Sequence, residues 1–270
     1  MILFLEELIL FGLTQFFGIL IALNSSKFIQ EGVVKLSFTT RDFLVLAVLL
    51  IVFVFLTRKF SEKSAAVFKT ILVLVIIFGT QTVLSLFFNI IVATLLGVLL
   101  AYLILKTKIV FIHNVGVLLA TAGIGGIFGL AITPILAVLL LLVLSFYDII
   151  AVYKTKHMVK LAEDMIKSRA IFGIVLPQNS RGWLESLENV RPGGKFMILG
   201  SGDIAMPLVL ISSVVAASGL SAGLIVMLFS FVGLFLTHEL FIAQRQRRPM
   251  AALPPIAALS IIGYLVSIIL

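Results

Sequence analysis

Residues 199–207, Leu-Gly-Ser-Gly-Asp-Ile-Ala-Met-Pro, place one carboxylate, Asp203, inside an apolar run from Phe196 to Ala217. A charged side chain inside such a hydrophobic segment is costly in hydrocarbon and usually marks a functional site. Gly200 and Gly202 leave the backbone before Asp203 uncovered, so another chain can approach the carboxylate closely. The segment therefore has the features of a site that meets a substrate backbone, with Gly200, Ser201 and Gly202 offering an edge for strand addition.

The rest of the chain has the composition of a polytopic membrane protein. Of its 270 residues, 61% are hydrophobic and 12% are charged, which excludes an ordinary soluble protein. Its long apolar runs each approach the roughly 20 residues that a helix needs to cross about 30 Å of hydrocarbon. The alternating pattern of outer-membrane strands does not occur. The predicted fold class is all-α.

The apolar runs predict nine transmembrane helices. The division between the third and fourth spans rests on Asn89, because the stretch from Thr70 to Leu105 contains no charged residue. The predicted spans are 1–23, 43–57, 70–88, 90–105, 109–130, 132–153, 196–217, 219–241 and 250–270. The chain is thus divided into helices one to six (1–153), a loop (154–195) and helices seven to nine (196–270).

The distribution of Lys and Arg predicts the orientation of this bundle. With nine spans, most of the 20 basic residues fall on one side, in the segments 58–69, 106–108, 154–195 and 242–249. Under the positive-inside rule, the N-terminus and the 154–195 loop are cytoplasmic and the C-terminus is extracytoplasmic. The net charge of +8 is explained by this topology and by contact with the lipid bilayer, so we expect no nucleic-acid partner.

A second carboxylate, Asp148, lies at the same depth as Asp203. It precedes Lys154 by six residues and Asp203 follows Lys195 by eight, which places both roughly 9–12 Å from the cytoplasmic face. The other acidic residues lie in loops or near helix ends, where water or headgroups can solvate them. Two like charges in a low dielectric cannot both ionise easily, so such a pair shares a proton and can perform aspartyl-protease chemistry. Tyr147 could serve as a hydrogen-bond donor or an interface anchor.

Three short motifs resemble those of the presenilin and signal peptide peptidase family. The family's YD, GxGD and PAL motifs are matched, in order, by Tyr147-Asp148, Gly200-Ser201-Gly202-Asp203 and Ala252-Leu253-Pro254, on the sixth, seventh and ninth spans. The family consists of intramembrane aspartyl proteases, so the resemblance implies that Asp148 and Asp203 are catalytic. It also implies that the PAL-like segment helps to form the substrate cleft. One departure is that Ala251 stands where the family's PAL segment begins with proline.

The resemblance also indicates what the protein acts on and where it resides. The orientation, the short loop and the absence of cysteine are similar to those of a microbial presenilin homologue, so we expect the plasma membrane of a microbe. The implied substrates are single-span transmembrane proteins or peptides. No metal or organic cofactor is expected, the oligomeric state is open, and nothing in the sequence indicates a required partner subunit.

Other functions use some of the same residues. An ion or proton-coupled transporter or channel could relay cations through the two aspartates, although no internal repeat is present. Prepilin peptidases share a GxGD motif, but theirs is typically followed by a lysine where Ala205 stands. His238-Glu239 begins like a zinc-protease motif, but Ile242 occupies the position of the second histidine. A rhomboid-like serine at Ser221 lacks a matching histidine, and a non-catalytic scaffold leaves the buried acids unexplained.

Overall fold

Uninterrupted apolar runs form helices in this protein because a helix satisfies its own backbone hydrogen bonds in a solvent that offers none. The computed structural model describes residues 2–30, 64–191, 194–244 and 249–270. The predicted second span, 43–57, lies outside the described residues. The helices are α1 (Ile2–Gln30), α3 (Ser64–Leu84), α4 (Ile90–Thr107), α5 (Val110–Ala131), α6 (Pro134–Ile149), α7 (His157–Ser168), α8 (Ser201–Ser218), α9 (Leu220–Ile242) and α10 (Leu253–Ile269).

Among the described residues, seven helices are long and apolar enough to cross a membrane, namely α1, α3, α4, α5, α6 with its continuation, α8 and α9. The last helix, α10, is equally apolar but shorter. The helix α7 follows the π-helical turn η1 (Ile150–Lys154). It is amphipathic and mixes charged with apolar residues. The protein is therefore a mostly helical, membrane-embedded bundle.

Asn89 separates two helices, as the sequence predicts. The side chain of Asn89 accepts a hydrogen bond from the backbone N–H of Val92 at 2.9 Å and caps the start of α4. An N-cap satisfies one of the amides that the first turn leaves without a helical partner. The uncharged stretch from Thr70 to Leu105 thus folds as two helices, α3 and α4, and not as one.

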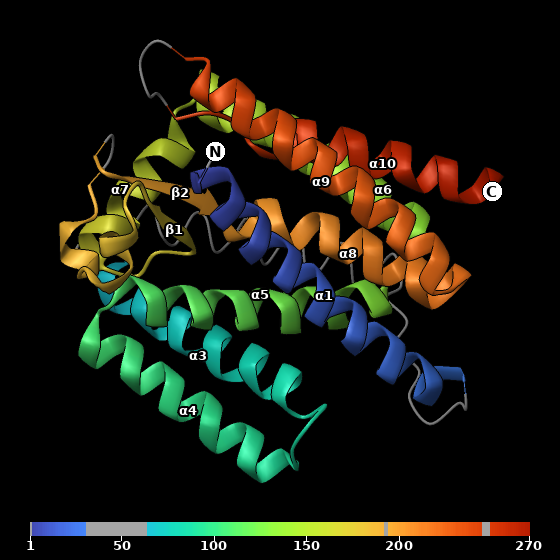
Figure 1. Ribbon diagram of the computed structural model, residues 1–270, viewed down its shortest axis with the longest axis horizontal. Coiled ribbons are helices and arrows are strands. Elements are labelled where there is room, and N and C mark those ends of the chain that lie inside the picture. The colour runs from blue at the N-terminus through green and yellow to red at the C-terminus, as the bar shows by residue number, and fades with distance from the viewer. Residues whose placement is uncertain (1, 31–63, 192–193, 245–248) are drawn as a thin grey trace.

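The central helix of the bundle is α5, which packs against α1, α3 and α8 (Figure 1). Beyond α8 lie α9 and α6, and α10 packs along α9. Small residues allow the backbones around α5 to approach closely: a Cβ atom at Gly123 would collide with the backbone of Gly79, and one at Gly129 would lie 2.6 Å from the carbonyl oxygen of Val209. The glycines of α5 are therefore packing residues.

A two-stranded antiparallel sheet lies at one end of the bundle. It consists of β1 (Gly173–Pro177) and β2 (Phe196–Gly200), with Gly173 opposite Gly200 and Pro177 opposite Phe196. The apolar run before Pro177 is thus a buried strand. The predicted seventh span was wrong at its start, because residues 196–200 form β2 and the helix begins at Ser201. A short apolar run fits either structure, and pairing with β1 decides for a strand.

Candidate active site

Asp148 lies in the last turn of α6, immediately before the wider turn η1. Its half-buried side chain accepts a hydrogen bond through Oδ2 from the backbone N–H of Leu253 at 3.4 Å. Leu253 opens α10, and the next two residues, Pro254 and Pro255, have no N–H to donate. The single amide that α10 offers at this point therefore holds the carboxylate at the end of α6.

Asp203 lies in the first turn of α8, three residues after β2 ends. Its carboxyl group folds back over the strand, and the backbone of Gly200 makes a hydrogen bond with it. A Cβ atom at Gly200 would lie 2.9 Å from Oδ2 of Asp203, closer than real Cβ contacts allow. A methyl group at position 200 would therefore displace the carboxyl group of Asp203.

The structure brings Asp148 and Asp203 together from two helices that pack against each other, α6 and α8. Their carboxyl groups interact electrostatically. Each group is also hydrogen-bonded by a backbone amide outside its own helix. A shared proton requires two acids on neighbouring elements, and the pairing of Asp148 with Asp203 stays a prediction.

The other residues singled out from the sequence differ in how deeply they are buried. Ala251 and Leu253 are buried, Ala252 and Pro254 are partly buried, and all four lie where α10 begins. Ser201 donates its backbone N–H to the carbonyl oxygen of Phe172 at 3.1 Å, which joins α8 to the residue before β1.

Tyr147 is the exception among the predicted support residues. It is 45% exposed, next to Asp148 in the chain. A role for its hydroxyl group at the active site stays a prediction.

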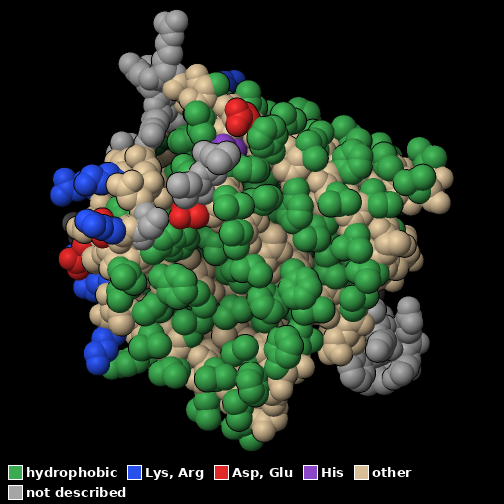
Figure 2. Space-filling view, viewed as in Figure 1, with side chains coloured by type: hydrophobic (Ala, Val, Ile, Leu, Met, Phe, Trp, Pro, Cys, Tyr) green, Lys and Arg blue, Asp and Glu red, His purple; other side chains and the backbone are tan. Residues whose placement is uncertain are grey.

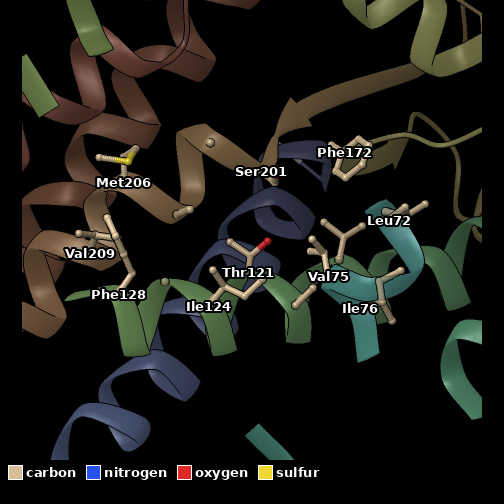
Figure 3. Close-up of a pocket in the computed structure, with 15 residues that line it drawn as sticks. Leu72, Val75, Ile76, Thr121, Ile124, Phe128, Phe172, Ser201, Met206 and Val209 are labelled. Carbon is tan, nitrogen blue, oxygen red and sulfur yellow. The ribbon is translucent and has the colours of Figure 1, made fainter. Parts of the chain in front are cut away.

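An apolar cavity of about 320 Å³ lies beside the second motif (Figure 3). Ser201 and Gly202 line it together with side chains of α3, α5 and the rest of α8, among them Ile76, Ile124 and Met206. A Cβ atom at Gly202 would meet nothing within 4 Å. The residue before Asp203 therefore faces open space.

Side chains of α5 close the outer edge of β1. Asn114 donates from Nδ2 to the carbonyl oxygen of Val175 at 2.7 Å and accepts from the N–H of Val175 at 2.8 Å. The ring of His113 hydrogen-bonds the carbonyl oxygen of Gly173 through Nε2 at 3.2 Å. In an antiparallel pair of strands, the backbone N–H and C=O groups point alternately toward the partner strand and away from it. The groups of Val175 point away from β2, so those of Ile198, opposite Val175, point away from β1. The free edge of the hairpin is therefore β2.

Glu7 is one of the acidic residues expected to be solvated near a helix end, and for it that expectation is wrong. Its side chain is buried, and Oε2 lies 2.6 Å from Nδ1 of His238 on α9. Nothing in the sequence links residues so far apart in the chain. A second buried contact also comes from α1: Gln15 donates from Nε2 to the carbonyl oxygen of Ile204, the residue after Asp203, at 3.2 Å. In the described part of the chain, no three His, Cys, Asp or Glu side chains form a group that could hold a metal.

Comparisons with known proteins identify the family and the fold. Residues 32–270 match the profile of the family described as signal-peptide peptidase, presenilin aspartyl protease. Two solved structures of a presenilin family intramembrane aspartate protease, in the C222 and P2 space groups, have similar folds. The first has a TM-score of 0.63 at 22% identity, over 97% of this chain and 95% of the other. The second has a TM-score of 0.62 at 24% identity, over 96% of both chains. No curated protein matches the chain significantly.

Proposed function

Because the chain belongs to the signal-peptide peptidase and presenilin family of aspartyl proteases, we propose that Asp148 and Asp203 are its catalytic pair. The protein is an intramembrane aspartyl protease, a hydrolase that cleaves peptide bonds within transmembrane segments. The assignment of the two residues rests on one observation above all: α6 and α8 pack against each other, and each carries one carboxyl group within an otherwise apolar bundle.

The chemistry follows from one proton shared between the two acids. The ionised carboxylate takes a proton from a water molecule, whose oxygen attacks the carbonyl carbon of the scissile peptide bond. The protonated carboxyl group donates its proton to the carbonyl oxygen, giving a neutral tetrahedral diol. As the diol collapses, one carboxyl group protonates the leaving nitrogen, the C–N bond breaks, and the other recovers a proton from the diol. The amides of Leu253 and Gly200 hold the carboxyl groups in position during these transfers.

Peptide hydrolysis requires the substrate to be unwound, since a helix shields its own carbonyl groups. An extended substrate segment can pair with the free edge of β2, where the backbone of Ile198 faces away from β1. Asp203 follows this edge by a few residues, so a strand added there passes the carboxylate. Gly202 leaves room for it, because no atom lies within 4 Å of the position of a Cβ atom. The buried start of α10, Ala251 to Pro254, forms another wall of the cleft.

The proposed topology has nine spans, with the N-terminus cytoplasmic and the C-terminus extracytoplasmic. On the face that Figure 2 shows, the described Lys and Arg side chains gather at one end, where α7 and the two strands lie (Figure 1). The start of α1 contacts the same end, because Trp183 donates from Nε1 to Oε1 of Glu6 at 3.1 Å. The C-terminus lies at the opposite end. Both observations support placing the N-terminus and residues 154–195 on the positive, cytoplasmic side.

The partners that this site suits are single-span transmembrane proteins or peptides within the lipid bilayer, in the plasma membrane of a microbe. One chain supplies both carboxyl groups, so the proposal needs neither a partner subunit nor a cofactor. Formation of a homo-oligomer is compatible with it.

Cleavage of a labelled single-span peptide by the purified protein in liposomes tests the proposal. Asp148→Asn and Asp203→Asn keep the shape of each side chain but remove its acid–base function, so each is expected to reduce kcat by about 10²–10⁴-fold. Asp164→Asn, on α7, is the matched control and should keep wild-type activity. Mass spectrometry should place the cut inside the span. Cleavage that survives both substitutions at positions 148 and 203 would show that these residues are not the catalytic pair.

A further inference from the structure

One peptide group connects α9 to Asp148. The peptide bond between Ala252 and Leu253 is hydrogen-bonded at both ends: its carbonyl oxygen accepts from the hydroxyl group of Thr237 at 3.3 Å, and its N–H donates to Oδ2 of Asp148 at 3.4 Å. A peptide group is planar and rigid, so fixing its carbonyl end also fixes the direction of its N–H. The orientation of the Asp148 carboxylate therefore depends on a side chain that does not touch it.

The position of Thr237 is itself well defined. Its side chain is 4% exposed, and its single hydroxyl proton is shared between the carbonyl oxygens of Ala252 and Gly233, the latter at 2.9 Å. One turn earlier, a Cβ atom at Gly233 would lie 2.7 Å from Cα of Ile256. The backbones of α9 and α10 thus touch next to Thr237, which leaves the hydroxyl group little freedom to move away from Ala252.

A neighbouring face of α9 is anchored as well. His238, the next residue, is buried against Glu7 of α1 at 2.6 Å. The end of α9 is therefore held by both α10 and α1. A helix segment fixed in this way can transmit the position of one hydroxyl group to the peptide that it contacts.

We propose that Thr237 is a positioning residue for Asp148, acting through the Ala252–Leu253 peptide group. The inference rests on the proposed catalytic role of Asp148. Hydrogen bonds in a chain polarise one another, so the Thr237 hydroxyl strengthens the N–H that Leu253 presents to the carboxylate. With Oδ2 held by this amide, Oδ1 of Asp148 is left to face the water and the second acid. Thr237 contributes to kcat without contacting the substrate.

Two pairs of variants isolate the hydroxyl group. Thr237→Val has nearly the size and shape of threonine without its hydroxyl group, and Thr237→Ala differs from Thr237→Ser in the same way. In liposomes with a labelled single-span peptide, each variant without the hydroxyl group should have a kcat about five- to tenfold below that of its partner, the size expected from one lost hydrogen bond. KM should stay the same within each pair, and Thr237→Ser should stay near wild type.

Ser230→Ala is the matched control on the same helix. The Ser230 hydroxyl group is also buried, but it donates to the carbonyl oxygen of Met227 in its own helix, at 2.7 Å. This variant should keep the wild-type kcat. Thermal unfolding of all variants identifies any that fail to fold. If one pair contains a variant that does not fold, the kcat values of the other pair still test the role of the hydroxyl group.

The outcomes separate this inference from the proposed function. If Asp148→Asn is inactive but the members of a folded pair differ by less than about twofold in kcat, Thr237 does not position the carboxylate. A change in KM alone, or equal losses in Thr237→Ser and Thr237→Ala, would indicate a structural role and also overturn the inference. If Asp148→Asn keeps full activity, the proposed function itself fails, and the inference fails with it.

Discussion

The backbone N–H of Leu253 donates a hydrogen bond to Oδ2 of Asp148 at 3.4 Å, across 105 positions of the chain. This bond makes the first turn of α10 a part of the candidate active site. The two prolines that follow Leu253 cannot donate, so α10 directs one amide, and not several, toward the carboxylate. The PAL-like segment therefore has a defined chemical task here although Ala251 replaces the usual proline.

The two glycines of the second motif should respond differently to the same substitution. In Gly200→Ala, the new methyl group would lie 2.9 Å from Oδ2 of Asp203 and displace the carboxyl group. We expect kcat to fall by about tenfold or more, since small displacements of a catalytic group are costly. In Gly202→Ala, the methyl group meets nothing within 4 Å, so kcat should stay within about twofold of wild type. Steady-state cleavage kinetics on both variants measure this, and equal losses in kcat would contradict the proposed geometry.

The pair formed by Glu7 and His238 should show strong coupling in a double-mutant cycle. Removing one partner leaves the other buried without its hydrogen bond, so Glu7→Leu or His238→Leu should each lower the free energy of unfolding by about 1–3 kcal/mol. The double variant should recover part of that loss, because no polar group is then left unpaired. Unfolding of the four proteins in detergent measures the coupling. Simple additivity of the two single losses would show that the contact is energetically unimportant.

The ion pairs of Glu188 should make a pH-dependent contribution to stability. Its hydrogen bond with Lys108 at 3.0 Å and the charges of Arg169 and Lys108 hold the pKa of this carboxyl group below its usual value. A group whose folded pKa is depressed stabilises the fold above its unfolded pKa, about 4.3, and loses that contribution as the pH falls through the folded pKa. The difference in Tm between wild type and Glu188→Gln should thus be greatest near neutral pH, shrink as the pH falls below the unfolded pKa, and vanish below the folded pKa. Glu163→Gln, on α7, is the control, and a difference that grows toward low pH would contradict this assignment.

Much of this architecture follows from local features of the sequence. Asn89 indicates the break between α3 and α4 because its side chain caps a helix, and Asp148 and Asp203 are identifiable because charge is rare in apolar runs. The start of α8 could not be predicted in the same way. The residues from Phe196 to Gly200 suit a helix or a strand equally well, and their conformation depends on β1, which lies about twenty residues away in the chain.

The buried contact between Glu7 and His238 could not be predicted from the sequence, for a similar reason. A carboxylate near a chain end has the same local sequence whether it is solvated or buried, and only the packing of α1 against α9 decides between the two. The hydroxyl group of Thr237 is likewise an ordinary feature of an apolar helix until α10 packs beside it.

The hydrogen bonds from Asn114 and His113 to β1 also limit self-association of the protein through its sheet. A hairpin with two open edges can pair with the hairpins of neighbouring molecules on both sides and seed an extended sheet. Here side chains of α5 occupy both backbone groups of Val175 and the carbonyl oxygen of Gly173 along one edge, so a foreign strand is directed to the other edge. Self-association through this sheet would end at two copies, and a substrate strand in place on β2 would prevent even that.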